Sequence, residues 1–161
     1  MGFRDHRTFP SYPFNGAGRL AGAGGLDYTA PMKDSLREYF DRQLDVVIAQ
    51  APPRVRELLD EVTMYVEDHP SRRLMQQLGV RHRRSLCGLY TGIPLTERRV
   101  QISGVLSDAI YLYREGILAM ATRRRGRIDE EELRRQIRIT LLHELGHYHG
   151  LSEAELEDLG Y

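Results

Sequence analysis

The sequence has little cysteine, no net charge and no long apolar run, and each absence narrows what the chain can be. Cys87 is the only cysteine among 161 residues, which excludes an internal disulfide and favours a reducing compartment. Lys plus Arg and Asp plus Glu both number 23, so the global charge predicts neither a nucleic-acid partner nor a membrane partner. No apolar run approaches the length that crosses a bilayer, and the opening MGFRDHRTFP lacks the apolar core of a secretory signal. We therefore expect a cytoplasmic protein.

Two regions of the chain differ in composition. Residues 1–31 contain GAGRLAGAGGL, which is rich in glycine and alanine and has no amphipathic period, so we expect a flexible N-terminal tail. Residues 32–161 carry helix and strand patterns, and their length fits one domain that buries a core without disulfides. The sequence leaves the oligomeric state open, with a homodimer among the alternatives.

The patterns in residues 32–161 predict an α+β fold in which a small mixed sheet of about three or more strands packs on helices. Apolar residues between 36 and 48 recur at three- and four-residue steps and predict a helix, with Ser35 and Glu38 as its capping box. A short helix follows Pro53, and another, over residues 71–78, ends at Gly79.

Three runs predict strands, at residues 61–68, 85–95 and 108–115. Gly88 and Gly92 within the second run suggest a bulge or a bend. In the third run Ile110 and Leu112 face one way, whereas Ala109, Tyr111 and Tyr113 face the other. Residues 109–114 are either a sheet edge that pairs with an extended peptide or an interior strand with its tyrosines in the core or on the sheet surface.

The longest predicted helix begins after Asp129 and has three glutamates in its first turn, where the helix dipole favours negative charge. Gly150 ends it, and Ser152 with Glu155 caps a last short helix. The final turns of the long helix hold the stretch LLHELGHYHGLSE, residues 141–153. Half of the six histidines of the chain lie within these thirteen residues.

His143 and His147 are four residues apart, so on a helix their imidazoles project side by side and are able to share one metal ion. Two neutral imidazoles suit Zn²⁺. Glu144 lies one step round the helix, where it is poorly aimed as a ligand but able to act as a general base on water at the metal. This arrangement is the HExxH pattern of zinc peptidases. His149 points to nearly the opposite side and is not counted as a ligand; it is able to interact with the last-turn carbonyls instead.

A catalytic zinc ion needs a third protein ligand and an open position for water. Gly150 is able to turn the chain back, and the spacing then lets Glu153 approach the ion. Glu157 and Asp158 remain rival candidates, and Glu153 is alternatively a first-turn acid beside the Ser152 cap.

The stretch HELGHYHGLSE resembles the HExxHxxGxx(D/E) signature of zincin-like metallopeptidases, and the wider context is similar to bacterial minimal zincins. The resemblance covers roughly residues 34–161 and includes VEDHPS, GLYTGIPLTER, AIYLYR and the C-terminal DLGY. It implies a zincin-like fold with a long C-terminal active-site helix, zinc ligands at His143 and His147, a base at Glu144 and a third ligand at the position of Glu153. It also implies that Tyr161 forms a floor beneath the metal.

From these observations we predict a zinc-dependent metallopeptidase that binds one Zn²⁺ ion and hydrolyses a peptide or protein substrate with zinc-activated water. Two alternatives remain. The first is a non-catalytic zincin-like domain that binds a metal or a partner. The second is nucleic-acid binding through the basic clusters at residues 81–84 and 123–127, against which the zero net charge argues. Cys87 lies in an apolar run and is expected to be a buried, inert thiol rather than an active one.

Overall fold

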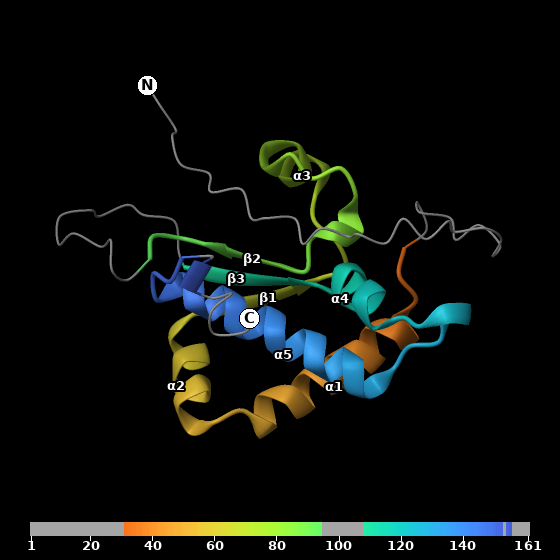
Figure 1. Cartoon of the computed structure of the whole chain (residues 1–161), viewed down its shortest axis with the longest axis horizontal. Coiled ribbons are helices and arrows are strands. Elements are labelled where there is room, and N and C mark those ends of the chain that lie inside the picture. Colours follow the sequence, from red (N-terminus) through yellow and green to blue (C-terminus); the bar gives the residue numbers. More distant parts are fainter. Residues whose placement is uncertain (1–30, 95–107, 153, 156–161) are drawn as a thin grey trace.

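The computed structural model of the protein describes residues 31–94, 108–152 and 154–155. The described part folds as a mixed α+β structure, as the sequence predicts, and its elements succeed one another in the order that Figure 1 shows. The elements are α1 (Asp34–Gln50), α2 (Pro53–Glu61), β1 (Thr63–Glu67), α3 (Arg72–Leu78), the short 3₁₀ turn η1 (Arg83–Ser85), β2 (Gly88–Thr91), β3 (Ala109–Tyr113), α4 (Arg114–Ala121), the 3₁₀ turn η3 (Arg124–Gly126) and α5 (Glu130–Tyr148).

The described strands form one three-stranded sheet in the order β1-β3-β2. β1 runs parallel to β3, with Thr63 opposite Ala109, and β2 runs antiparallel to β3, with Gly88 opposite Leu112. β3 is therefore the central strand, and of the two alternatives for residues 109–114 the sheet edge is wrong. The physical reason is burial: four of the five β3 residues are buried, and a strand covered on both faces gains most from pairing along both sides.

The helices cover the two faces of the sheet unequally. Figure 1 shows α1, α2 and α5 on one face and the short α3 on the other. Ile110 and Leu112 point toward the larger helical layer, whereas Tyr111 and Tyr113 belong to a smaller cluster with Leu89, so the predicted alternation along β3 is confirmed. The main core consists of buried apolar side chains from α1, β3, α4 and α5 together with Val62: Phe40, Leu44, Val47, Val62, Ile110, Leu112, Ile117, Leu118, Ala121, Leu133, Ile137, Leu141 and Leu145.

Several helix ends follow the local sequence. The Asp129 side chain accepts a hydrogen bond from the Glu132 backbone N–H at the start of α5, and Ser71 accepts one from Leu74 at the start of α3. α3 ends at Gly79, which has the left-handed φ of 67° expected of a C-terminal glycine. The capping box predicted at Ser35 is wrong, because the N-cap of α1 is Lys33, two residues earlier, and Lys33 makes no side-chain hydrogen bond there.

Helix α4 begins directly where β3 ends, whereas the sequence pattern predicted a strand continuing to residue 115. The N-cap is Tyr113, which offers no capping side chain, so no local signal marks the change. Gly116 lies in the first turn, and a Cβ there would stand 2.2 Å from the Leu86 carbonyl oxygen. The close approach of α4 to the segment before β2 therefore depends on this glycine.

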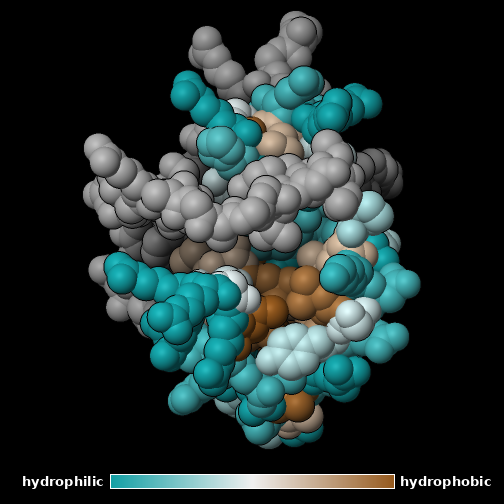
Figure 2. Space-filling view, turned by 90° about the vertical axis from the view of Figure 1, so that its right-hand side faces the viewer, coloured by the Kyte–Doolittle hydropathy of each residue, from teal (hydrophilic) through white to brown (hydrophobic). Residues whose placement is uncertain are grey.

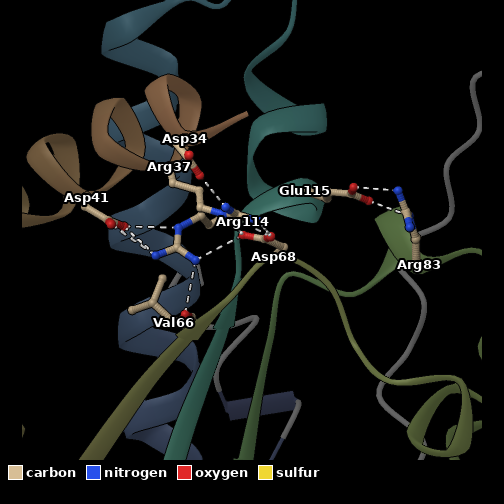
Figure 3. Close-up of polar contacts among 8 residues, drawn as sticks. All are labelled: Asp34, Arg37, Asp41, Val66, Asp68, Arg83, Arg114 and Glu115. Atoms are coloured by element: carbon tan, nitrogen blue, oxygen red, sulfur yellow. Dashed lines mark hydrogen bonds and ion pairs between the residues drawn. The ribbon is translucent and has the colours of Figure 1, made fainter. Parts of the chain in front are cut away.

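The junction of β1, β3 and α4 is held by a network of opposite charges, which Figure 3 shows. The Arg114 guanidinium, whose side chain is only 11% exposed, donates to Asp41 at 2.8 Å, to Asp68 at 3.2 Å and to the Val66 carbonyl at 3.1 Å. Arg37 of α1 reaches the same Asp68 at 2.6 Å. The network ties α1 to the ends of β1 and β3.

A second pair in Figure 3 joins α4 to the segment before β2. Arg83 and Glu115 lie 2.6 Å apart, and both side chains are largely buried. Because Glu115 follows Arg114 directly, the first two residues of α4 are each anchored by an ion pair to a different part of the chain.

Among the described residues, few large apolar side chains are well exposed. Figure 2 faces the end of the molecule where α1 begins and α4 ends, and it shows a brown apolar area bordered by hydrophilic residues. Met120 near the end of α4 and Tyr65 on β1 are each 48% exposed. Among the described helices, none combines the length and the apolar character that a membrane crossing requires.

Candidate metal centre and active site

The last two turns of α5 bring the two predicted metal ligands together. The Nε2 atoms of His143 and His147 lie 3.1 Å apart, and the ring planes are inclined at 80° with their centroids 4.7 Å apart. Two nitrogens bound to one tetrahedral Zn²⁺ at 2.0–2.1 Å stand about 3.3 Å apart. The separation of the two imidazoles therefore fits a shared ion, and the same atoms are at hydrogen-bond distance when no ion lies between them.

The other ring nitrogen of His147 is fixed by the chain reversal after α5. Its Nδ1 lies 3.2 Å from the Leu151 carbonyl oxygen. Because a carbonyl only accepts, Nδ1 is the donor, and in the neutral ring the lone pair is on Nε2, the nitrogen that faces His143. A histidine oriented by a backbone carbonyl in this way is common among zinc ligands.

Gly150 makes this reversal, as the sequence predicted. Its φ of 85° lies in the left-handed region, and the Leu151 backbone N–H returns to the Gly146 carbonyl at 3.0 Å. Beyond the turn, the Ser152 backbone N–H and hydroxyl both donate to the Glu155 carboxylate at 2.7 Å, so the predicted capping box is confirmed.

Glu144 occupies a different side of α5 from the two histidines. Its side chain is directed toward β2, and the residue is only 3% exposed. Its carboxylate lies against Gly88: a Cβ built on that glycine would stand 2.6 Å from Glu144 Oε1. The candidate general base is thus enclosed between the long helix and the sheet.

Gly88 has a role other than the predicted bulge or bend. The expected bulge or bend is absent there, since Gly88 pairs in regular register with Leu112 of β3. The bend falls at Gly92, after β2 has ended, where φ is 146°. A glycine inside a strand also signals a close approach by another group, and that reading applies at Gly88.

The remaining predicted site residues lie outside the described part of the chain. These are Glu153, its rivals Glu157 and Asp158, and the predicted floor residue Tyr161. Within residues 31–94, 108–152 and 154–155, no group of three or more His, Cys, Asp or Glu side chains is placed to hold a metal ion. The described residues thus supply a pair of candidate ligands, and the third ligand stays a prediction.

His149 stands apart from the pair. The ring is partly exposed and packs edge-on against Tyr148 at 5.2 Å between centroids. Its Nε2 is buried and makes no hydrogen bond, so this nitrogen does not reach the last-turn carbonyls. Its backbone N–H instead closes the helix on Leu145 at 3.1 Å.

The only cysteine lies next to Gly88. Burial raises the pKa of the Cys87 thiol to about 12, and the Glu144 charge adds to this effect. At neutral pH the thiolate is therefore scarce, which supports the expectation of an inert cysteine.

The two basic clusters are partly engaged in internal ion pairs. Arg83 is bound to Glu115, and Arg123 is bound to Asp129 at the start of α5. The hollow of about 370 Å³ beside the second cluster is lined by four arginines and by Asp129, so a carboxylate offsets part of its charge. Neither cluster lies on the last two turns of α5, where the histidines are.

A comparison with known proteins matches the region of the chain that contains this site. A family model described as "Zincin-like metallopeptidase" matches residues 59–161, which is more than half of the sequence and includes β1 to α5. A search of the curated proteins found no match. The matched residues include the helix that carries the paired imidazoles and the strand that covers Glu144. The chain therefore belongs to the zincin-like metallopeptidase family.

Proposed function

We propose that this protein is a zinc-dependent metallopeptidase, a hydrolase of peptide bonds. His143 and His147 would hold one zinc ion, with Glu153 as the third ligand, and Glu144 would act as the general base. The observation that carries the proposal is the 3.1 Å separation of the two Nε2 atoms, combined with the Leu151 carbonyl that orients His147. Family membership supports the reaction class, because zincin-like domains are metallopeptidases by description.

A zinc ion, when bound, supplies a Lewis acid that lowers the pKa of water to about 7 and stabilises negative charge on a carbonyl oxygen. The residues of the chain perform the remaining steps. The Glu144 carboxylate accepts a proton from the attacking water and later delivers it to the leaving amine. Its enclosure between α5 and β2 excludes bulk water from one side of the carboxylate, which strengthens its electrostatic interactions with a reacting group.

The substrate would lie along β2 rather than along β3. β3 has a neighbour on each side, whereas β2 is an end strand of the sheet formed by the described residues. Gly88 is the first residue of β2, and a Cβ built on it would stand 2.6 Å from Glu144 Oε1. An extended peptide that pairs with the backbone of β2 would therefore pass beside the candidate base.

Replacement of Glu144 by Gln tests the mechanism. We expect the variant to keep zinc while its turnover falls by about 10²–10⁴-fold, the usual contribution of a general base. Zinc content is measured by metal analysis, and turnover by digestion of a broad peptide library followed by mass spectrometry. Glu131→Gln is the matched control, because Glu131 is an exposed carboxylate in the first turn of the same helix and should retain full activity.

Retained turnover in Glu144→Gln would overturn the assignment of the base. A zinc-loaded native protein that cleaves no member of the library would instead favour the non-catalytic zincin-like domain. The two results differ, because the second is seen without any substitution.

The cellular setting belongs to the same proposal. A lone cysteine, which is unable to form an internal disulfide, supports a cytoplasmic location, where thiols stay reduced. We propose a peptide or protein as the partner and neither nucleic acid nor membrane. Cell fractionation tests the location, and sedimentation of the purified protein distinguishes a monomer from a homodimer.

A further inference from the structure

We infer that Gly88 is a positioning residue for the candidate base: the absence of a side chain lets β2 lie directly on the Glu144 carboxylate and fixes where that carboxylate sits. The inference rests on the proposed function, in which Glu144 is the base. It adds to that function a residue outside the HExxH pattern, on a different element of the fold.

Side chains of α5 fill the space next to Gly88. A Cβ at this position would stand 2.6 Å from Glu144 Oε1, 2.9 Å from Glu144 Cγ and 2.7 Å from Thr140 Cγ2. All three distances are shorter than real Cβ contacts allow. Two of the three atoms belong to Glu144, so any side chain at position 88 displaces the carboxylate or lifts the strand.

The backbone does not explain the glycine. The described glycines with positive φ are Gly79, Gly92, Gly126 and Gly150, and Gly88 is not among them. It pairs regularly with Leu112 in an ordinary strand, where other residues are favoured over glycine. Gly79 shows the opposite case, with a φ of 67° and no atom within 4 Å of a built Cβ. Glycine at position 88 therefore meets a requirement for space rather than for chain conformation.

The face of α5 that carries Glu144 is joined to β2 on both sides of the carboxylate. Thr140 lies one turn earlier and touches the same glycine. Tyr148 lies one turn later, and its ring meets Tyr90 of β2 edge-on at 5.9 Å between centroids. Residues 140, 144 and 148 repeat at four-residue steps, so they form one ridge beneath the strand. Such contacts restrict the rotamers of Glu144, and a general base requires this restriction.

The test substitutes Ala at Gly88, with Gly79→Ala as the matched control. Both changes add one methyl to a glycine, but only the first meets Glu144. In zinc-loaded Gly88→Ala protein we expect kcat to fall at least about tenfold with KM nearly unchanged, because small misplacements of a catalytic group are costly. Zinc stoichiometry should stay at the native value in both variants. Gly79→Ala should keep the native kcat, although its backbone strain lowers Tm.

A merely structural role for Gly88 would lower Tm without lowering the kcat of the zinc-loaded, folded fraction. Native kcat in zinc-loaded Gly88→Ala would therefore overturn the inference. If Gly88→Ala does not fold, Gly88→Ala with Thr140→Ser takes its place. The serine removes Cγ2 and keeps the hydroxyl, which donates to the Gln136 carbonyl at 2.9 Å.

Two further measurements test the inference without any substrate. A crystal structure of the Gly88→Ala variant should show the Glu144 carboxylate moved by about 1 Å or more, and the Tm loss should shrink when Glu144 is also changed to Ala. A carboxylate that stays in place, or a Tm loss equal in both backgrounds, would overturn the inference. Absence of turnover in the native protein would count against the proposed function alone, because these two measurements do not require activity.

Discussion

Two of the polar clusters among the described residues differ in how their side chains are paired. In the arginine cluster of Arg114, Arg37, Asp41 and Asp68, each charge faces an opposite charge on another element. In the site cluster of His143, His147 and Glu144, two imidazoles meet at their nitrogens and a carboxylate sits on a glycine. Opposite charges at close range join separate elements of the fold, whereas under the proposed function the two imidazoles would hold a metal ion and the carboxylate would act as the base. The arginine cluster should therefore control stability and the site cluster should control metal binding.

The substitution His143→Ala should distinguish the site cluster from the arginine cluster most clearly. We expect zinc stoichiometry to drop from about one ion per chain to near zero, because one imidazole with the proposed Glu153 ligand binds far more weakly than the complete set of ligands. The unfolding midpoint measured in the presence of a chelator should stay close to native, since His143 is only partly buried. His149→Ala is the matched control and should keep its zinc. Equal zinc loss in both variants would contradict the assignment of the pair.

Arg114→Ala should have the opposite profile. Removing Arg114, whose side chain is 11% exposed, breaks its ion pair with the half-exposed Asp41 and leaves Asp68 paired with Arg37 alone, so we expect a loss of about 2 kcal/mol in the free energy of unfolding. Urea denaturation measures it. The control is Arg42→Ala, which breaks a pair with Glu38 that is 3.9 Å long and mostly exposed, and should cost about 0.5 kcal/mol or less. A loss no larger than that of the control would show that Arg114 is not structural.

Acid should weaken the arginine cluster by a smaller amount. The hydrogen bond from Arg37 is the main cause that lowers the pKa of Asp68 below its ordinary value of 3.8. The folded state therefore binds the Asp68 proton less readily than the unfolded state. The stabilisation is present above pH 3.8 and is lost as the pH falls through the lowered pKa. Urea unfolding of native protein and of Asp68→Asn across this range checks the sign, because the native protein should lose more stability on acidification.

The sequence predicted best where a local signal is strong. Asp129 and the glutamates after it mark the start of α5, and Gly150 marks its end, so the helix that carries the site was correctly expected. Ser71 and Gly79 likewise mark the start and the end of α3. In each case a capping side chain or a left-handed glycine acts within a few residues, which is the range that a sequence pattern reports.

The features that the sequence did not predict depend on contacts between residues that are far apart in the chain. The central place of β3 depends on pairing with β1, which lies far away in sequence. α4 follows β3 without a capping residue, and the arginine cluster joins residues from α1, β1 and α4. Gly88 was recognised as unusual, but its reason lies in Glu144, more than fifty residues further on. Contacts of this range leave no periodic trace in a sequence.

The position of β3 also has a consequence for how the chain assembles. It is the last of the three described strands to be synthesised, yet β1 and β2 pair only with it and not with each other. A nascent chain that ends before Ala109 therefore forms none of these strand pairings. In such a chain the backbone groups of β1 and β2 that pair with β3 have no strand to bond to. The three-stranded pairing therefore requires that residues 109–113 have already left the ribosome.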